Sequence, residues 1–445
     1  MRDTASLKTD LYELTMAAGY FYHQTNLRAT FELYCHSMPP KRSYLIACGL
    51  KQALEYILTL TFSSGDIKYL KSLPVFRKVD PKFFTYLRKF KFSGDVWAMD
   101  EGEICFANEP VLQVEAPIIE AQILETYLLS IFNIQMSVAS KAARIVDAAC
   151  HDGIKRSVVD FGSRRAHGPE AGVLAARAAY IGGCIGTSNV YAGKKFAMPI
   201  FGTMAHSWIQ AFDSEEEAFT KYHEVFPEQT VLLIDTYDTL EGVTKAVKAC
   251  QDFKAVRLDS GNINILSRKV RKILDRSGCK NVKIVASGDL NEDKIYDLVR
   301  LKAPVDMFGV GTQMVVSRDY PALDLTYKLV QTTDAQGRLR FRSKKSQGKQ
   351  TVPGRKQVFR KSDSLGMMQK DHVGLFYEKP ISGVKPLLRP VIKKGGMVKK
   401  LSPLERVRKN VTIKVGHLPS ELRSLHHGSE YPVKYTPILD KIRDS

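Results

Sequence analysis

The chain has 445 residues, of which 44% are hydrophobic and 25% charged, and its formal net charge is +19. The length predicts two or three domains, and the composition excludes a disordered or fibrous protein. Apolar runs stay shorter than the roughly 18 residues that a membrane helix needs, and the N-terminal segment has no apolar core, so we predict a cytoplasmic protein with no membrane partner.

The N-terminal third reads as a mixed α+β domain. Residues 10–25 predict a helix that Asp10 can cap, and residues 46–92 are mainly helical. Short alternating runs between residues 95 and 115, separated by Gly, Asn and Pro, predict a small antiparallel sheet. We place this domain at residues 1–137.

The middle of the chain repeats a short apolar strand, a polar loop and a helix. Parallel strands need such helical crossovers, so residues 138–325 are predicted to form an irregular TIM-like α/β barrel. In such a barrel the chemistry lies at the carboxyl ends of the strands. The predicted strands are residues 157–161, 199–201, 231–234, 255–258, 282–286 and 307–310.

The positive charge is concentrated in the C-terminal segment, which we place at residues 326–445. Residues 338–409 hold 21 Lys and Arg against 4 Asp and Glu, an excess of 17. Such a block can bind nucleic acid, attract phosphorylated substrates or form a solvated basic face. Apolar residues punctuate it, so we interpret it as folded, and nucleic acid is the less favoured partner.

Cysteine usage points to no metal or disulfide framework. The seven cysteines are scattered singly, and the sequence contains no Cys-x-x-Cys. No side chains are assigned as metal ligands.

The strand ends of the middle region carry polar groups suited to anions. Two adjacent guanidiniums, Arg164 and Arg165, follow the first strand on a loop bounded by glycines. They suit a planar or multiply charged anion, although structural ion pairs are the alternative. Arg257 and Asp259 stand two residues apart and point to the same side of a strand, where a structural ion pair is again the alternative.

Two glycine-containing strand ends suit a phosphate. Glycine lets backbone N–H groups approach an anion closely, and a helix N-terminus favours negative charge. The candidate residues are Gly288, Asp289, Gly309, Gly311 and Thr312.

Four motifs together resemble the nicotinate phosphoribosyltransferase family. They are residues 160–168 (DFGSRRAHG), 185–189 (IGTSN), 202–207 (GTMAHS) and 257–261 (RLDSG), in the order in which the family has them. The resemblance runs from about residue 10 to the C-terminus. It implies that the barrel is inserted in an α+β domain formed by the N- and C-terminal segments, with residues 326–445 packing on the N-terminal domain.

The resemblance also implies an activity. The family joins nicotinate to the ribose of 5-phosphoribosyl-1-pyrophosphate, releases pyrophosphate and couples the reaction to ATP hydrolysis through a phosphohistidine, in NAD salvage. Mg²⁺ accompanies the pyrophosphate and ATP. A homodimer with shared active sites is implied.

Residue roles follow from matching positions. Nicotinate would contact Phe161, Ser188 and Arg257, and Tyr12 of the second subunit would cover the other face of its ring. At the position of Ser188 the related nicotinamide phosphoribosyltransferases carry an aspartate, which would repel the carboxylate of nicotinate. Ser188 therefore favours the acid over the amide.

The remaining implied roles concern phosphate and catalysis. His206 would take the phosphoryl group from ATP, with Asp235 as the carboxylate that orients its ring. Asp259 would stabilise the cationic ribose centre. Arg164 would join the glycine-rich strand ends at the 5-phosphate. The alternatives are a nicotinamide phosphoribosyltransferase, which Ser188 disfavours, and a basic nucleic-acid-binding protein on a barrel scaffold, which the intact motif set disfavours.

Overall fold

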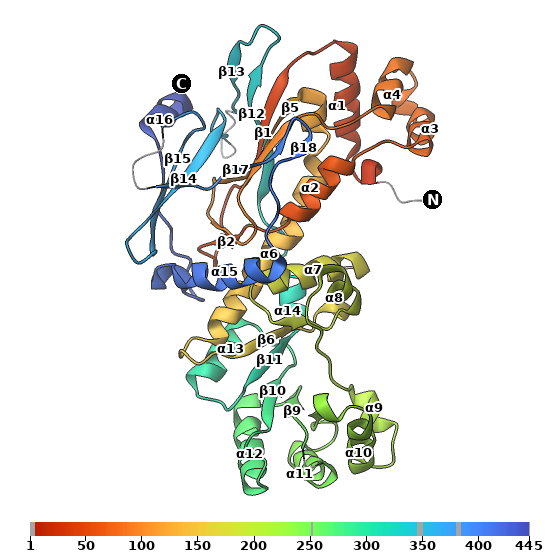
Figure 1. Cartoon of the computed structure of the whole chain (residues 1–445), viewed down its shortest axis with the longest axis vertical. Coiled ribbons are helices and arrows are strands. Elements are labelled where there is room, and N and C mark those ends of the chain that lie inside the picture. The colour runs from red at the N-terminus through yellow and green to blue at the C-terminus, as the bar shows by residue number, and fades with distance from the viewer. Residues whose placement is uncertain (1–4, 251, 345–349, 380–383, 445) are drawn as a thin grey trace. The chain divides into compact units, whose positions relative to one another are not determined.

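The computed structural model describes residues 5–250, 252–344, 350–379 and 384–444 (Figure 1). Residues 345–349 and 380–383 of the basic segment lie outside the described residues. The chain divides into two compact units. Unit 1 consists of Met1–Met136, Ala322–Val407 and Gly416–Ser445, and unit 2 consists of Ser137–Pro321 and Arg408–Val415. Two helices, α6 (Glu125–Ala149) and α15 (Leu404–Gly416), cross the boundaries.

Several helices of unit 1 start at residues that favour helix starts. At α3 (Ser64–Ser72), Ser63 and Asp66 form a reciprocal capping box. Asp10 occupies the N-cap position of α1 (Leu11–Tyr22) as predicted, but its side chain makes no capping bond, because its carboxylate accepts a hydrogen bond from Thr126 Oγ1 at 3.1 Å. The other helices of this unit are α2 (Leu50–Thr59), α4 (Pro81–Arg88), α5 (Ile118–Gln122) and α16 (Pro437–Asp444).

A seven-stranded sheet joins distant parts of the sequence in unit 1. β1 (Arg28–Cys35) lies between β5 (Pro110–Pro117) and β12 (Leu325–Thr333) and is antiparallel to both. All its residues after Arg28 are buried, so both faces of this strand are covered. The outer strands are β13 (Leu339–Phe341), β3 (Asp95–Ala98), β17 (Arg389–Lys393) and β18 (Gly396–Met397).

A four-stranded sheet carries much of the C-terminal segment. Its central strands β14 (Lys356–Ser362) and β15 (Met368–Leu375) form an antiparallel pair, visible in Figure 1 as adjacent blue strands. Short strands flank them, and a two-stranded ladder lies elsewhere in the unit. These strands are β16 (Lys385–Pro386), β19 (Val433–Tyr435), β2 (Leu45–Ile46) and β4 (Ile104–Cys105).

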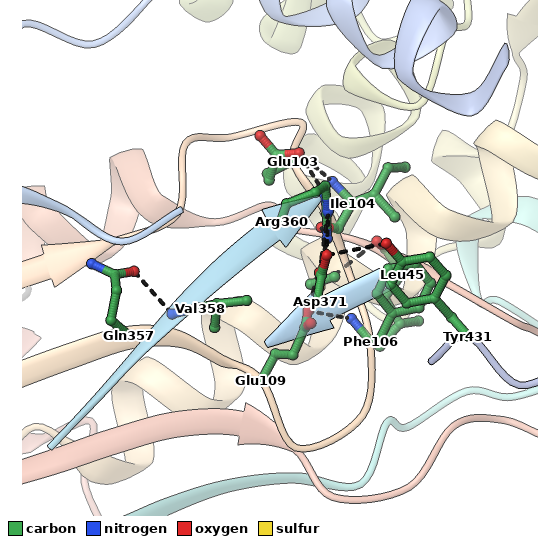
Figure 2. A network of polar contacts seen from close by, with 11 residues as sticks. Leu45, Glu103, Ile104, Phe106, Glu109, Gln357, Val358, Arg360, Asp371 and Tyr431 are labelled. Atoms are coloured by element: carbon green, nitrogen blue, oxygen red, sulfur yellow. Dashed lines mark hydrogen bonds and ion pairs between the residues drawn. The ribbon is translucent and has the colours of Figure 1, made fainter. Parts of the chain in front are cut away.

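Pairing of β14 with β15 sets up a buried polar cluster, because the register places Arg360 opposite Asp371 (Figure 2). Arg360 binds Asp371 through Nη2 at 2.6 Å and Glu103 through Nη1 at 2.9 Å, and Glu109 lies 4.0 Å away. Tyr431 donates its hydroxyl to Asp371. Burial alone would lower the pKa of Arg360, but the three carboxylates raise it.

Unit 2 is built on a six-stranded parallel sheet in the order β7-β6-β11-β10-β9-β8. The residues at the centres of its strands, such as Leu232, Val256 and Ile284, are fully buried. The strands are β6 (Ser157–Asp160), β7 (Gly186–Thr187), β8 (Val231–Leu233), β9 (Ala255–Leu258), β10 (Lys283–Ala286) and β11 (Met307–Val310). Figure 1 shows β6, β11, β10 and β9 running side by side.

Helices connect these strands, as parallel pairing requires. α10 packs against α11, and α11 against α12. The helices are α7 (Pro169–Ile181), α8 (Val190–Phe196), α9 (His206–Gln210), α10 (Glu215–Val225), α11 (Thr239–Ala249), α12 (Ile263–Arg276), α13 (Glu292–Arg300) and α14 (Thr312–Val315).

One predicted strand is wrong. Residues 199–201 form no strand, and only a single bridge joins Ile200 to Thr187. Proline at 199 has no N–H to donate to a ladder, so pairing there is limited. The position next to β6 is instead taken by β7. No helix among the described residues combines the length and the apolarity needed to cross a bilayer.

A candidate active site at the carboxyl edge of the parallel sheet

A cavity of about 760 Å³ lies in unit 2, lined by residues that follow the carboxyl ends of its strands. The cavity is lined by the residue that directly follows the end of each of five strands, β6, β7, β9, β10 and β11. Of the thirteen site residues predicted from the sequence, eleven line the cavity: Phe161, Arg164, Ser188, His206, Arg257, Asp259, Gly288, Asp289, Gly309, Gly311 and Thr312. Asp235 and Tyr12 are not among the lining residues.

Two glycines allow the segments that form the cavity wall to pack closely. Gly288 has φ +86°, and a Cβ there would lie 1.8 Å from the carbonyl oxygen of Asp259. Any side chain would push apart the loops after β9 and β10. Gly309 lies under the ring of Phe161, where a Cβ would be 2.4 Å from ring carbon Cδ2. The glycines of these strand ends are therefore required for packing, whatever ligand they also approach.

Phe161, Ser188 and Arg257 present an aromatic ring, a hydroxyl and a guanidinium to the same cavity. The backbone of Ser188 is fixed, because its N–H donates to the carbonyl of Asp160 at 2.9 Å. Its hydroxyl makes no hydrogen bond to any other described residue, so it remains available to a ligand. Ring, hydroxyl and cation together suit a flat aromatic acid.

Arg257 is a largely buried cation with incomplete pairing. Its Nη1 donates to Thr203 Oγ1, its Nη2 lies 3.8 Å from Asp259 Oδ1, and its Nε is buried without a partner among the described residues. Burial lowers the pKa of Arg257, Asp259 and Asp235 oppose this, and nearby Arg164 adds to the lowering. An anionic ligand would relieve that burial cost.

Asp259 is held on the wall of the cavity by its neighbours. Its Oδ1 accepts a hydrogen bond from Ser287 Oγ, and its backbone N–H donates to Asp235 Oδ2 at 2.8 Å. Its Oδ2 lies 4.0 Å from His206 Nε2. A carboxylate in this position can stabilise a cation that forms in the cavity.

His206 is oriented by a residue that the sequence did not single out. Its Nδ1 lies 3.1 Å from Thr236 Oγ1. Asp235, the predicted orienting carboxylate, turns instead to the loop after β9, where its Oδ2 also accepts from Ser260 Oγ at 2.7 Å. The predicted orienting contact is therefore made by the next residue along the chain. A lone threonine carries no sequence signal that could have shown this.

The arginine pair after β6 faces the cavity without carboxylate partners. Arg164 and Arg165 both line it, and neither forms an ion pair within the described part of the chain. The structural ion pairs considered from the sequence are thus not formed here. Asp289, by contrast, accepts a hydrogen bond from Gln313 Nε2 at 2.9 Å and forms an ion pair with Lys294 Nζ at 3.1 Å, and both contacts lower its pKa. The cavity keeps an excess of positive charge.

Tyr12 lies in unit 1, near the start of α1. Its side chain is 43% exposed, and burial of the rest, with Glu125 and Glu13 nearby, raises its pKa to about 12.

Polar residues to which the sequence analysis assigned no role hold the loops that line the cavity through hydrogen bonds. Asp160 is buried and accepts from Thr187 Oγ1 at 2.7 Å and from the N–H of Gly162 at 2.9 Å, and burial raises its pKa. Asn189 binds Ser163 Oγ. Within the described residues, no three His, Cys, Asp or Glu side chains are grouped so that they could hold a metal ion.

Comparisons with known proteins identify the family of the chain. Models of the nicotinate phosphoribosyltransferase N-terminal domain, family and C-terminal domain match residues 7–133, 156–356 and 376–443. A nicotinate phosphoribosyltransferase of Mycobacterium tuberculosis is 44% identical over 96% of this chain and 91% of its own. One of Bacillus subtilis is 40% identical, covering 85% and 77%.

A solved structure supports the same assignment. The crystal structure of human nicotinic acid phosphoribosyltransferase matches with a TM-score of 0.84 and 25% identity, covering 98% of this chain and 99% of that one. The family models, the two bacterial relatives and this fold agree, and the chain belongs to the nicotinate phosphoribosyltransferase family.

Proposed function

We propose that the protein is a nicotinate phosphoribosyltransferase that makes nicotinate mononucleotide in NAD salvage. The ring nitrogen of nicotinate bonds to C1 of 5-phosphoribosyl-1-pyrophosphate, while the bond from C1 to the pyrophosphate oxygen breaks and pyrophosphate leaves with the electron pair. The observation that carries the proposal is the cavity. It brings together Arg164 and Arg165, which form no ion pair with any described residue, the glycines of the strand ends, and the largely buried, partly paired Arg257.

Residues of the cavity match each chemical group of the two substrates. Phe161 stacks on the pyridine ring, and Arg257 and Ser188 bind the carboxylate. Arg164, with the strand ends that carry Gly288, Asp289, Gly309, Gly311 and Thr312, binds the phosphoribose. Asp259 stabilises the positive charge that develops at C1 as pyrophosphate departs.

Coupling to ATP uses His206, which takes the phosphoryl group as a phosphohistidine. His206 lines the same cavity as the arginine pair, so a triphosphate can reach it. Asp235 fixes the turn that carries Asp259 and Ser260, because its carboxylate accepts hydrogen bonds from both residues. Mg²⁺ enters with the phosphates of the substrates, since proteins hold that ion through one or two carboxylates plus substrate phosphates. Asp259 and Asp289 are the carboxylates that line the cavity.

The finer architecture follows from family membership. We propose that the parallel sheet of unit 2 belongs to an irregular barrel inserted in an α+β domain, and that the enzyme is a cytoplasmic homodimer. Tyr12 of the second subunit would then cover the ring of nicotinate. The partial exposure of Tyr12 within one chain supports this.

The direct test measures nicotinate mononucleotide formation from phosphoribosyl pyrophosphate and Mg²⁺, with nicotinate or nicotinamide, each with and without ATP. We expect product from nicotinate that rises with ATP. Product from nicotinamide alone would contradict the role of Ser188, and no product from either base would contradict the activity itself.

A second test concerns base selection. Ser188→Asp places a carboxylate against the carboxylate of nicotinate, and we expect KM for nicotinate to rise by at least about tenfold. Ser188→Ala is the control, because it removes the hydroxyl without adding charge. Equal KM values for wild type and Ser188→Asp would exclude Ser188 from the base site.

A third test concerns ATP. His206→Ala should lose both ATP stimulation and the transfer of label from [γ-³²P]ATP to the protein. Unchanged ATP stimulation in this variant would remove His206 from its proposed role.

A further inference from the structure

His206 needs a fixed ring to act, and little in its own segment provides one. It is the first residue of the short helix α9, and 40% of its side chain is exposed. Gly202, four residues earlier, lies in open space. An exposed imidazole on such a segment can rotate about its side-chain bonds unless a neighbour holds it.

The neighbour that holds it is Thr236, on the loop after β8. Thr236 Oγ1 lies 3.1 Å from Nδ1, within hydrogen-bonding distance. In the described part of the chain, Asp259 is the one carboxylate within 4.0 Å of the ring, and its Oδ2 lies 4.0 Å from Nε2, which is too far for a direct hydrogen bond. Among the described residues Thr236 thus makes the one short polar contact to the ring.

Thr236 is itself anchored on both sides. Asp235, just before it, is buried and binds the N–H of Asp259 and the hydroxyl of Ser260. Asp238, two residues after it, caps α11 by accepting from the N–H groups of Leu240 and Glu241, each at 2.9 Å. The hydroxyl of Thr236 therefore projects from a rigid turn.

The same turn fixes both partners of the catalytic pair. Asp235 sets the position of Asp259, and Thr236 sets the rotation of the His206 ring. The gap between Nε2 and Oδ2 is thus determined by two consecutive residues of one loop. A shift of about 1 Å at such a pair can reduce a rate about 100-fold.

We propose that Thr236 is a positioning residue, whose hydroxyl holds the His206 imidazole in one rotation for phosphoryl transfer from ATP. This rests on the proposed role of His206. A hydroxyl can donate a hydrogen bond to an imidazole nitrogen or accept one from its N–H, so Thr236 can hold Nδ1 in either tautomer. Its contribution is the orientation of the ring.

The first experiment observes the ring directly and does not depend on ATP chemistry. Protein labelled with ¹⁵N in histidine is studied by NMR over a pH series, and the signal of His206 is assigned by its loss in His206→Gln. We expect the Nδ1 signal to have the same chemical shift in the wild type and in Thr236→Ser, and to move in Thr236→Val, which has lost the hydrogen bond to Nδ1. Identical ring spectra in the wild type and Thr236→Val would overturn the proposal.

The second experiment measures the rate of label transfer from [γ-³²P]ATP to the full-length enzyme. Thr236→Val should slow it about three- to tenfold, the value of one hydrogen bond, while Thr236→Ser stays within about twofold of wild type. Thr244→Val, which removes a hydroxyl from the exposed face of α11, is the matched control and should leave the rate unchanged.

The outcomes separate the two proposals. If the wild type takes no label, the phosphohistidine is wrong, and the ring spectra still decide whether Thr236 positions His206. If the wild type is labelled and Thr236→Val is labelled equally fast, the positioning role is wrong and the phosphohistidine stands. If Thr236→Ser fails as completely as Thr236→Val, the hydroxyl is not what matters, which also contradicts the proposal.

Discussion

Arg360 in unit 1 is buried and Arg257 in unit 2 is largely buried, but their pKa values shift in opposite directions. Arg360 is surrounded by Asp371, Glu103 and Glu109, and their charges raise its pKa against the effect of burial (Figure 2). Arg257 lies 3.8 Å from one carboxylate, its Nε has no partner among the described residues, and burial lowers its pKa. The first guanidinium is fully paired within the fold, whereas the second keeps a polar atom that an anionic ligand could pair with.

The difference shows how to separate structural charges from functional ones. Both side chains are largely shielded from solvent and both lie near acidic residues, so burial alone does not explain the difference between them. Pairing does, because a saturated cation contributes to folding and an unsaturated one gains from binding an anion. The predictions below test this contrast, from the largest expected effect to the smallest.

Arg360→Met should destabilise unit 1 by about 3–5 kcal/mol, because the buried carboxylates of Asp371 and Glu103 lose their counter-charge. Urea unfolding followed by circular dichroism measures this. Lys361→Met is the control, since it changes the adjacent, exposed residue of the same strand. A change in unfolding free energy below about 1 kcal/mol would show that the cluster is not held by Arg360.

Gly288→Ala should reduce kcat/KM about 100-fold, because a Cβ would collide with the carbonyl of Asp259 and move the partner of Arg257. Gly202→Ala is the matched control. It also lines the cavity, but its Cβ would meet nothing within 4 Å. Equal losses in the two variants would mean that the position of Asp259 is unimportant.

Arg257→Met should lower kcat/KM for nicotinate about 10- to 100-fold through loss of a charged hydrogen bond. Its unfolding free energy should stay within about 1 kcal/mol of wild type, because the buried guanidinium it removes is poorly compensated. Steady-state kinetics and urea unfolding on the same preparation give both values. A stability loss as large as that of Arg360→Met would erase the contrast between the two sites.

Glu109→Gln should flatten part of the pH dependence of stability. Burial, and then Asp371, raise the pKa of Glu109 well above its ordinary value of 4.5, so the native state keeps a proton that the unfolded chain releases. This stabilisation is fully present below about pH 4.5 and is lost as the pH rises through the native pKa.

The measurement for this variant is the free energy of unfolding between pH 4 and pH 9. The decline of the wild type with rising pH should be steeper than that of Glu109→Gln, and the exposed control Glu421→Gln should follow the wild type. Parallel curves for wild type and Glu109→Gln would show that Glu109 takes up no proton on folding.

The elements that local pattern specifies were predictable from the sequence. Strands β8 to β11 lie within one residue of their predicted bounds, because each is an apolar run followed by a polar turn. Their parallel order brings the strand ends together, which is why eleven predicted residues share one cavity. β7 was missed because two residues, Gly186 and Thr187, carry no periodicity.

Features that depend on distant partners were not predictable. Nothing near β1 indicates that it pairs with β12, about 300 residues later, or that residues 408–415 belong to unit 2. Asp10 and Asp235 were assigned from local rules, as a helix cap and as a partner of His206. Each binds elsewhere because a competing donor, Thr126 or the Asp259 turn, lies closer in the fold.

The central place of β1 has a consequence for biosynthesis. β1 and β5 can pair once residue 117 has been made, but β12 does not begin until residue 325. At about 5–20 residues per second, one edge of this buried strand waits about 10–40 s on the ribosome for its second neighbour. An unpaired apolar strand edge is a template for aggregation. The nascent N-terminal segment is therefore the part of this chain that most needs chaperone protection while unit 2 is still being translated.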